Sequence, residues 1–289
     1  MPIDNLIGHD LLLNDLIALY KVNRLPSKII LSGKKGIGKS LIVKNFLYNV
    51  FNDENSKLLI NNNTHTNILN LNKKNEKKII EIEQIREILK FTNRSSFNNK
   101  SRFIIIDDAE FLNINSSNAL LKSLEEPNNN VFFFLIYNSD KKILDTVKSR
   151  CLEIKVLIKL EHTKSIVNQY FDEEIYDEIN KSLVNFYSTP KFLISLIIYL
   201  KKNNLSLFDT NIVNLVRNII DNKHYNKDEF IVEYIHYIVE LFFYNHINYK
   251  KKISYKLKQY YYSKLSKIKK FNLDYESFFL EFEDNLLSE

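Results

Sequence analysis

Short apolar runs and amphipathic segments alternate along the first 156 residues. The apolar runs are rich in β-branched and aromatic residues, and together with one alternating segment near residue 154 they cover residues 28–31, 103–106, 131–136 and 152–156. Runs of this length are typical of strands buried on both faces of a parallel sheet. Two shorter runs, 58–60 and 68–71, are interpreted as short strands within an Asn- and Lys-rich surface loop.

Between these runs, apolar residues recur at every third or fourth position, as on one face of a helix. Such segments are residues 11–20, 41–47, 80–92 and 143–148. Pro26 is expected to end the first helix. Another helix is expected to begin at a cap formed by Asn115 or Ser116 and to end at Pro127. Strands that alternate with helices predict an α/β fold with a parallel sheet.

From about residue 158 the pattern becomes helical throughout. Helices are predicted over residues 159–170, 173–187 and 190–202, and residues 207–289 form further helices dense in Ile, Leu, Phe and Tyr, such as 230–243. The second half of the chain is therefore expected to be all-α.

Residues 33–40 fit the pattern G-x-x-x-x-G-K-[ST], whose backbone N–H groups wrap the phosphates of a nucleotide. The residues are Gly33, Lys34, Lys35, Gly36, Ile37, Gly38, Lys39 and Ser40. Lys39 would reach the β- and γ-phosphates and Ser40 would hold Mg²⁺, while the following helix points its positive end at the same anion. A chance match occurs roughly once in a hundred chains. Three of the chain's four glycines lie in this loop, which favours a phosphate site.

Polar side chains follow two of the predicted strands. Asp107 and Asp108 end the strand at 103–106, and ligands of an open α/β sheet bind at the carboxyl ends of strands. Asp107 would hold the Mg²⁺ that Ser40 also holds; the alternative is an ordinary strand ending in a turn. Asn138, after the strand at 131–136, could orient water or sense a γ-phosphate, or it could be a turn-favouring Asn.

Composition narrows the class of protein. The chain has 289 residues, 45% of them hydrophobic, and a net charge of +6 with a pI of about 9.0, which suits an acidic or nucleic-acid partner. The single cysteine, Cys151, excludes an internal disulfide and argues against a zinc site. The six histidines are scattered. We expect a cytoplasmic protein with no membrane contact, since no signal peptide and no spanning apolar run is present.

One stretch is strongly basic. Residues 249–270 contain nine lysines and no acid, interleaved with tyrosines. Such a stretch could contact nucleic acid; the interpretation favoured here is a solvated helix face with tyrosines packed inward. Residues 274–289 contain six acids and no base, so the two segments could neutralise each other across a helix pair.

Two further motifs carry a family resemblance. Residues 118–127 read N-A-L-L-K-S-L-E-E-P, and residues 149–151 read S-R-C. With the phosphate loop and the Asp-Asp strand end in this order, the chain resembles the AAA+ subunits of the bacterial clamp loader of DNA polymerase III over roughly residues 5–200. The resemblance implies an AAA+ nucleotide-binding domain (1–157), a helical lid (158–206) and a helical collar (207–289).

The resemblance also implies roles and partners. Arg150 would be an arginine finger that reaches the ATP site of a neighbouring subunit, and Asp108 takes the place of the carboxylate that positions the attacking water. Lys191 lies near the position of sensor 2, although the surrounding G-S-x-x-R pattern is lost; an exposed lysine at a helix start is the alternative. The implied partners are gamma/tau and delta subunits in a hetero-pentamer, the sliding clamp, and primer-template DNA through that complex.

Two kinds of clamp-loader subunit fit these features. A delta-prime-type subunit supplies Arg150 and hydrolyses little ATP itself, whereas a gamma/tau-type subunit is an active ATPase. Active members end the strand in Asp-Glu, and Asp108 is one methylene shorter than that Glu; the absence of a long tail also favours the delta-prime type. Residues 50–80 lack the four-Cys zinc module of many members, which does not decide. Bound ATP and Mg²⁺ fit both types, and an unrelated P-loop regulator is a distant third possibility.

Overall fold

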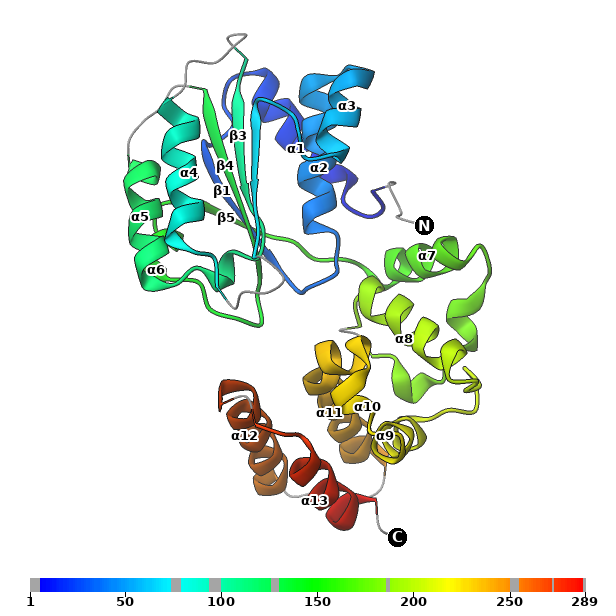
Figure 1. The fold of residues 1–289 in the computed structure, drawn as a ribbon. Coiled ribbons are helices and arrows are strands. Elements are labelled where there is room, and N and C mark those ends of the chain that lie inside the picture. Colours follow the sequence, from blue (N-terminus) through cyan, green and yellow to red (C-terminus); the bar gives the residue numbers. More distant parts are fainter. Residues whose placement is uncertain are drawn as a thin grey trace. The chain divides into compact units, whose positions relative to one another are not determined.

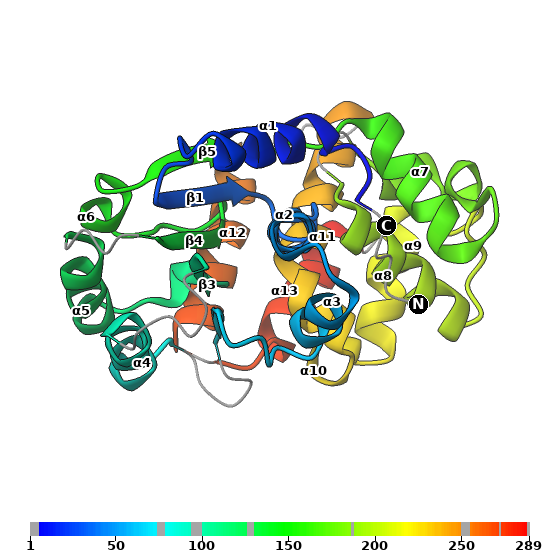
Figure 2. The ribbon, with the colours of Figure 1, turned by 90° about the horizontal axis from the view of Figure 1, so that it is seen from above.

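The computed structural model describes residues 6–73, 79–93, 100–125, 130–185, 188–249, 255–271 and 273–287. The chain divides into two units, Met1–Thr163 and Lys164–Glu289, each of which is described by itself. Figure 1 shows the sheet with its helices and the all-helical part, and Figure 2 shows the same elements from above.

A parallel sheet of five strands forms the centre of the first unit, in the order β2-β3-β4-β1-β5. The strands are β1 (Lys28–Gly33), β2 (Ile68–Leu71), β3 (Arg102–Ile106), β4 (Val131–Asn138) and β5 (Leu152–Lys155). All strands run in the same direction, so their carboxyl ends meet at one edge of the sheet. The predicted α/β fold with a parallel sheet is confirmed.

Helices cover both faces of this sheet (Figures 1 and 2). One face carries α1 (Asp10–Lys21), α2 (Lys39–Phe51) and α3 (Glu54–Asn61), and the other carries α4 (Ile82–Asn93), α5 (Ile114–Glu125) and α6 (Asp145–Lys148). Successive strand residues point to opposite faces. Thus Ile29 and Leu31 pack with α1 and α2, whereas Ile30 packs with α4 and α5. Because helices cover both faces, side chains that point to either face are buried, and the strands are therefore apolar at nearly every position.

The second unit is helical and has one continuous hydrophobic cluster. After α7 (Leu160–Phe171), which begins in the first unit, it contains two 3₁₀ turns, η2 (Ile175–Glu178) and η3 (Lys181–Leu183), and the helices α8 (Pro190–Lys202), α9 (Ile212–Asp221), α10 (His224–Lys227), α11 (Glu229–Tyr249), α12 (Tyr255–Phe271) and α13 (Glu276–Leu286). The expected all-α second half is confirmed, while its division into a lid and a collar at residue 206 stays a prediction.

Part of the basic stretch lies in α12, and residues 250–254 lie outside the described residues. Tyr261 is fully buried there and contacts Phe278 and Phe282 of α13. Lys264 forms an ion pair with Glu281 of α13. Tyr261 therefore packs inward, as expected, and one basic and one acidic side chain neutralise each other between α12 and α13.

Two predicted elements are wrong. Residues 58–60 are not a strand but belong to α3, which begins at the cap Asp53, whose side chain accepts the Ser56 N–H at 2.7 Å. Residues 173–187 are not one helix: η2 and η3 take its place over the described part, which excludes residues 186 and 187. There Asn180 accepts the Ser182 N–H, and such local bonds compete with helix formation.

Two helix ends differ from the prediction. The cap of α5 is Asn113, not Asn115 or Ser116: its Oδ1 accepts the Ser116 N–H at 2.8 Å, and the Ser116 hydroxyl accepts the Asn113 N–H at 2.9 Å. Pro127 lies outside the described residues. The first helix, α1, ends at Lys21 rather than at Pro26, because Asn23 adopts a left-handed conformation with φ of 56°.

Candidate functional site

The loop between β1 and α2 has the backbone that a phosphate cradle needs. Gly36 and Gly38 adopt φ angles of 84° and 98°, in the left-handed region that side chains disfavour. Gly33 is required for a different reason: a Cβ there would lie 2.6 Å from the backbone oxygen of Val156. Gly38 is also the N-cap of α2, so the first N–H groups of that helix open into the loop.

Lys39 is buried inside this loop, with the residue 7% exposed. Its Nζ donates to the carbonyls of Gly33 at 2.8 Å and Lys34 at 2.7 Å. Burial lowers the pKa of Lys39, and the nearby carboxylates, first among them Asp107, act in the opposite direction. A desolvated ammonium of this kind interacts more strongly with an anion than an exposed one does.

His9 supports the same loop from the N-terminal segment. Its Nε2 lies 2.7 Å from the backbone oxygen of Ile37, so this nitrogen carries the proton that is donated. The histidine is buried, and burial lowers its pKa. The carbonyl of Ile37 is thereby occupied, which helps to fix the loop between its two left-handed glycines.

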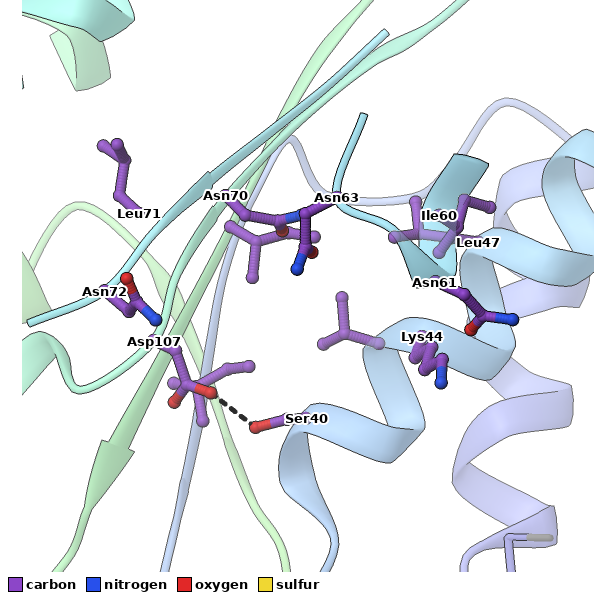
Figure 3. A pocket seen from close by; sticks show the side chains of 13 residues that line it. Ser40, Lys44, Leu47, Ile60, Asn61, Asn63, Asn70, Leu71, Asn72 and Asp107 are labelled. Carbon is purple, nitrogen blue, oxygen red and sulfur yellow. Dashed lines mark hydrogen bonds between the residues drawn. The ribbon is translucent and has the colours of Figure 1, made fainter. Parts of the chain in front are cut away.

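Ser40 and Asp107 are brought together although 67 residues separate them. The Ser40 hydroxyl donates to the Asp107 carboxylate at 2.6 Å, from the first turn of α2 to the end of β3 (Figure 3). They line a cavity of about 440 Å³, and the amides of Asn61, Asn63 and Asn70 line it as well. Within the described ranges, no cluster of three or more His, Cys, Asp or Glu side chains could hold a metal. Mg²⁺ held by this pair would therefore complete its shell with phosphate and water oxygens.

Asp108 follows in a strained position, with φ of 57°, and begins the 3₁₀ turn η1 (Ala109–Phe111). Burial raises the pKa of Asp108, and the negative charges of Asp107 and Glu110 raise it further. Three acids therefore gather at the end of β3, close enough to interact with one another and with Lys39.

Asn138 ends β4 directly beside Gly33, its register partner in β1. Its side-chain oxygen accepts the Asp140 N–H at 3.1 Å. This bond fixes the orientation of the amide, because the oxygen faces the Asp140 N–H and the Nδ2 donor lies on the opposite side of the amide group. Asn138 therefore presents an oriented amide beside Gly33, the first residue of the loop.

Arg150 lies in the turn between α6 and β5. Its Nε donates to the Glu125 carboxylate at 2.8 Å, its Nη2 lies 2.7 Å from the same oxygen, and its Nη1 donates to the Thr146 carbonyl at 3.0 Å. The side chain is nevertheless 37% exposed. Glu125 belongs to the N-A-L-L-K-S-L-E-E-P segment, whose last two residues lie outside the described residues. The two sequence motifs are thus in direct contact.

Lys191 belongs to the second unit, in the first turn of α8. The cap of this helix is Thr189, whose hydroxyl accepts the Phe192 N–H at 3.4 Å. Lys191 forms a half-exposed ion pair with Glu233 at 3.3 Å. The sensor role of Lys191 stays a prediction.

The sequence did not single out three residues that hold the site together: His9, Glu110 and Glu125. Each acts through a partner more than 20 positions away, namely Ile37, Asn138 and Arg150. A motif of contiguous residues gives no signal for such contacts. The only hint was that Glu125 lies in a motif that accompanies S-R-C.

Comparisons with known proteins point to one group. Residues 8–159 match the family model described as "DNA polymerase III, delta subunit". The "DNA polymerase III subunit delta'" of Pseudomonas aeruginosa is 33% identical over 90 residues, which is 31% of this chain and 27% of that protein. The "DNA polymerase III subunit gamma" of Buchnera aphidicola subsp. Schizaphis graminum is 32% identical over 137 residues, 45% of this chain and 38% of that protein.

A more distant relative is the "Replication factor C small subunit" of Natronomonas pharaonis, 27% identical over 150 residues, 52% of this chain and 42% of that protein. The matched segments thus span between 27% and 42% of the length of these relatives.

Among the described residues, every helix is too short or too polar to span a bilayer.

Among solved structures, a gamma subunit-related protein of Thermotoga maritima is 20% identical with a TM-score of 0.43, covering 78% of this chain and 76% of that one. The RuvB Holliday junction branch migration motor of Thermotoga maritima is 15% identical with a TM-score of 0.46, covering 77% and 79%.

Proposed function

The chain belongs to the family described as DNA polymerase III, delta subunit, and we propose that it is a clamp-loader subunit of the delta-prime type. In this role it binds Mg·ATP in the loop of residues 33–40 and supplies Arg150 to the ATP site of a neighbouring subunit. The partners proposed are gamma/tau and delta subunits in a hetero-pentamer, the sliding clamp, and primer-template DNA through the complex. The proposed location is the cytoplasm.

The observation that carries the proposal is the distance between Arg150 and the chain's own loop. Leu152 pairs with Ile29, near the beginning of β1, whereas the loop starts at Gly33, where β1 ends. Since a strand rises about 3.3 Å per residue, the four steps from Ile29 to Gly33 separate the level of Leu152 from the start of the loop by roughly 13 Å. Arg150 precedes Leu152, in the turn at the amino edge of the sheet. Because Arg150 lies at the amino edge and the loop at the carboxyl edge, the proposal is that Arg150 acts on phosphate bound in the loop of another chain.

The surroundings of Arg150 suit such a role. A guanidinium is a planar fork with a permanent charge. In Arg150 its orientation is fixed by three polar contacts, two to the Glu125 carboxylate and one to the Thr146 carbonyl. Preorganised charge stabilises a transferred phosphoryl group without further ordering, and arginine fingers supply about 10³–10⁵ in rate. The exposed part of the side chain is available to a neighbouring subunit.

The loop residues fit Mg·ATP, which would supply the phosphoanhydride bond that the assembly cleaves. Lys39 neutralises phosphate charge, Ser40 and Asp107 offer oxygen ligands to Mg²⁺, and Asn138 donates from Nδ2. Asp108 is one methylene shorter than the Glu of active members. A shortfall of about 1 Å in position can reduce a rate by roughly a hundredfold, so weak hydrolysis by this chain itself is expected.

The test is the DNA-stimulated ATPase of the reconstituted complex. Arg150→Ala is expected to reduce turnover at least a hundredfold, because the charge in the neighbour's site is lost. Arg150→Lys retains the charge but not the fork, and should recover only a small part. Lys39→Ala should leave turnover within about twofold. The reverse pattern, with Lys39→Ala abolishing turnover and Arg150→Ala neutral, contradicts the proposal.

The intact loop and the Ser40–Asp107 pair also favour a second candidate, an active gamma/tau-type ATPase. In that case the purified chain alone hydrolyses ATP, and Lys39→Ala and Asp107→Ala remove most of its turnover. Asp108 would then be a working substitute for Glu. Single-chain turnover measurements separate the two candidates.

A further inference from the structure

Glu110 is a buried acid to which the proposed function assigns no part. It lies in the middle of η1, three residues after Asp107, and its side chain is only 3% exposed. Burying a carboxylate is unfavourable unless strong partners compensate it. Its partners therefore indicate what the acid does.

Those partners are the two ends of one turn. The Oε2 atom accepts the backbone N–H of Asn138 at 3.1 Å, and Oε1 lies 3.4 Å from the Nζ of Lys141. The Lys141 N–H donates to the Asn138 carbonyl at 3.0 Å, which closes the turn at residues 138–141. The Nζ of Lys141 also lies 3.7 Å from the ring centre of Phe111, so η1 holds it from two sides.

The turn in question carries the amide of Asn138. The side chain of Asn138 accepts the Asp140 N–H, so the direction of its Nδ2 depends on the shape of the turn. Glu110 is in turn joined to the end of β3, because the Phe111 N–H donates to the Asp108 carbonyl at 2.9 Å. The Glu110 side chain thus connects η1, which follows Asp107 and Asp108, to Asn138 at the end of β4.

We propose that Glu110 is a positioning residue that holds the Asn138 amide toward the terminal phosphate, and so lets the site distinguish a nucleoside triphosphate from a diphosphate. This inference rests on the proposed nucleotide binding in the loop. Glu110 itself touches no phosphate. The negative charge of Glu110 also acts on two neighbours. It opposes the lowering of the Lys39 pKa that burial causes, and it adds to the rise of the Asp108 pKa.

The test measures affinity rather than turnover. Calorimetric titrations with Mg²⁺ compare the β,γ-imido analogue of ATP with ADP, in wild type and in Glu110→Ala. The ratio of the two affinities should fall about tenfold in Glu110→Ala, because one oriented hydrogen bond to a charged phosphate is lost. The affinity for ADP should change by less than about twofold.

A double-mutant cycle separates positioning from a general structural effect. Asn138→Ala should lower the ratio as much as Glu110→Ala, and the double variant should lose no more than either, because both remove the same interaction. Glu83, an exposed acid on α4 paired with Arg86 at 2.8 Å, offers the matched control. Glu83→Ala should keep the wild-type ratio.

Glu110→Gln retains an acceptor for the Asn138 N–H but cannot pair its charge with Lys141, and should reduce the ratio about threefold. It decides the question if Glu110→Ala does not fold. An unchanged ratio in a folded Glu110 variant, or fully additive losses in the double variant, overturns the inference. Failure of the wild type to bind either nucleotide overturns the proposed function first, and the inference with it.

Discussion

Charge inside the loop depends on a few buried groups. Burial lowers the pKa of Lys39, while Asp107 and Glu110 raise it. The same acids, after burial itself, raise the pKa of Asp108. The ammonium of Lys39 therefore lies among several carboxylates in a partly desolvated site. Mg²⁺ would compensate the carboxylates and Lys39 would compensate the phosphates. The site is expected to take metal and nucleotide together.

This expectation is tested by removing one proposed metal ligand. Asp107→Asn keeps the shape of the side chain and the contact with Ser40 but loses the negative charge. Nucleotide affinity with Mg²⁺ should fall about tenfold, since a hard cation prefers carboxylate oxygen. Affinity measured in excess chelator should not fall. A loss of equal size in both conditions would show that Asp107 does not act through the metal.

A second prediction at this scale concerns His236 of α11. Burial lowers the pKa of His236 to about 4, and the charge of Lys269 contributes. The unfolded chain takes up this proton near pH 6.5, so it binds more protons than the folded chain between pH 6.5 and 4. The histidine's contribution is therefore intact above pH 6.5 and is lost as the pH falls through that window.

His236→Gln removes this titration. Between pH 7 and pH 5, wild type should lose about 1 kcal/mol more unfolding free energy than His236→Gln, a value reduced for the partial exposure of the ring. Urea unfolding at the two pH values measures it. His9 and His65 remain in both proteins, so their contributions cancel. Equal pH dependence of the two proteins contradicts the prediction.

At the level of single residues, the sequence indicated which residues form the loop but not which distant residues hold it in place. Lys39 and Ser40 belong to a contiguous motif, and Asp107 follows a recognisable strand, so their joint position followed from the rule that strand ends meet. Glu110, by contrast, is one acid among many until β3 and β4 are paired. Its importance arises only from a backbone contact with Asn138. No spacing along the chain encodes that contact.

At the scale of elements, strong apolar patterns were sufficient and weak ones were not. The runs at 103–106 and 131–136 became β3 and β4, and residues 190–202 became α8. The run at 58–60 was too short to decide by hydrophobicity, and the Asp53 cap three residues before Ser56 was the stronger signal. For residues 173–187, local bonds of Asn180 outweighed a helical pattern.

The capping of α5 offers a test at this scale. Asn113→Ala removes the acceptor of the Ser116 N–H and should reduce the unfolding free energy by about 1 kcal/mol. Asn115 lies two residues later and is exposed, which makes Asn115→Ala the matched control, with an expected change within about 0.5 kcal/mol. Denaturant unfolding of both variants measures the difference. A larger loss in Asn115→Ala would restore the cap expected from the sequence.

For the molecule as a whole, the residues proposed to act lie at two opposite edges of the sheet of the first unit. The loop, Asp107 and Asn138 lie at the carboxyl edge, and Arg150 lies at the amino edge. The proposed contact between the Arg150 of one chain and the loop of another would join different surfaces, and a head-to-tail contact of this kind forms a ring when its rotation closes. The family resemblance read from residues 118–127 and 149–151 is confirmed by the match over residues 8–159.

Titration of Mg·ATP into the purified chain examines whether the loop and Arg150 belong to different sites, with wild type, Lys39→Ala and Arg150→Ala compared under identical conditions. We expect saturable binding to wild type, affinity at least tenfold weaker for Lys39→Ala, and wild-type affinity for Arg150→Ala, which alters the opposite edge of the sheet. Absence of binding, or equal weakening by both substitutions, would contradict a nucleotide loop and an arginine that act in different sites.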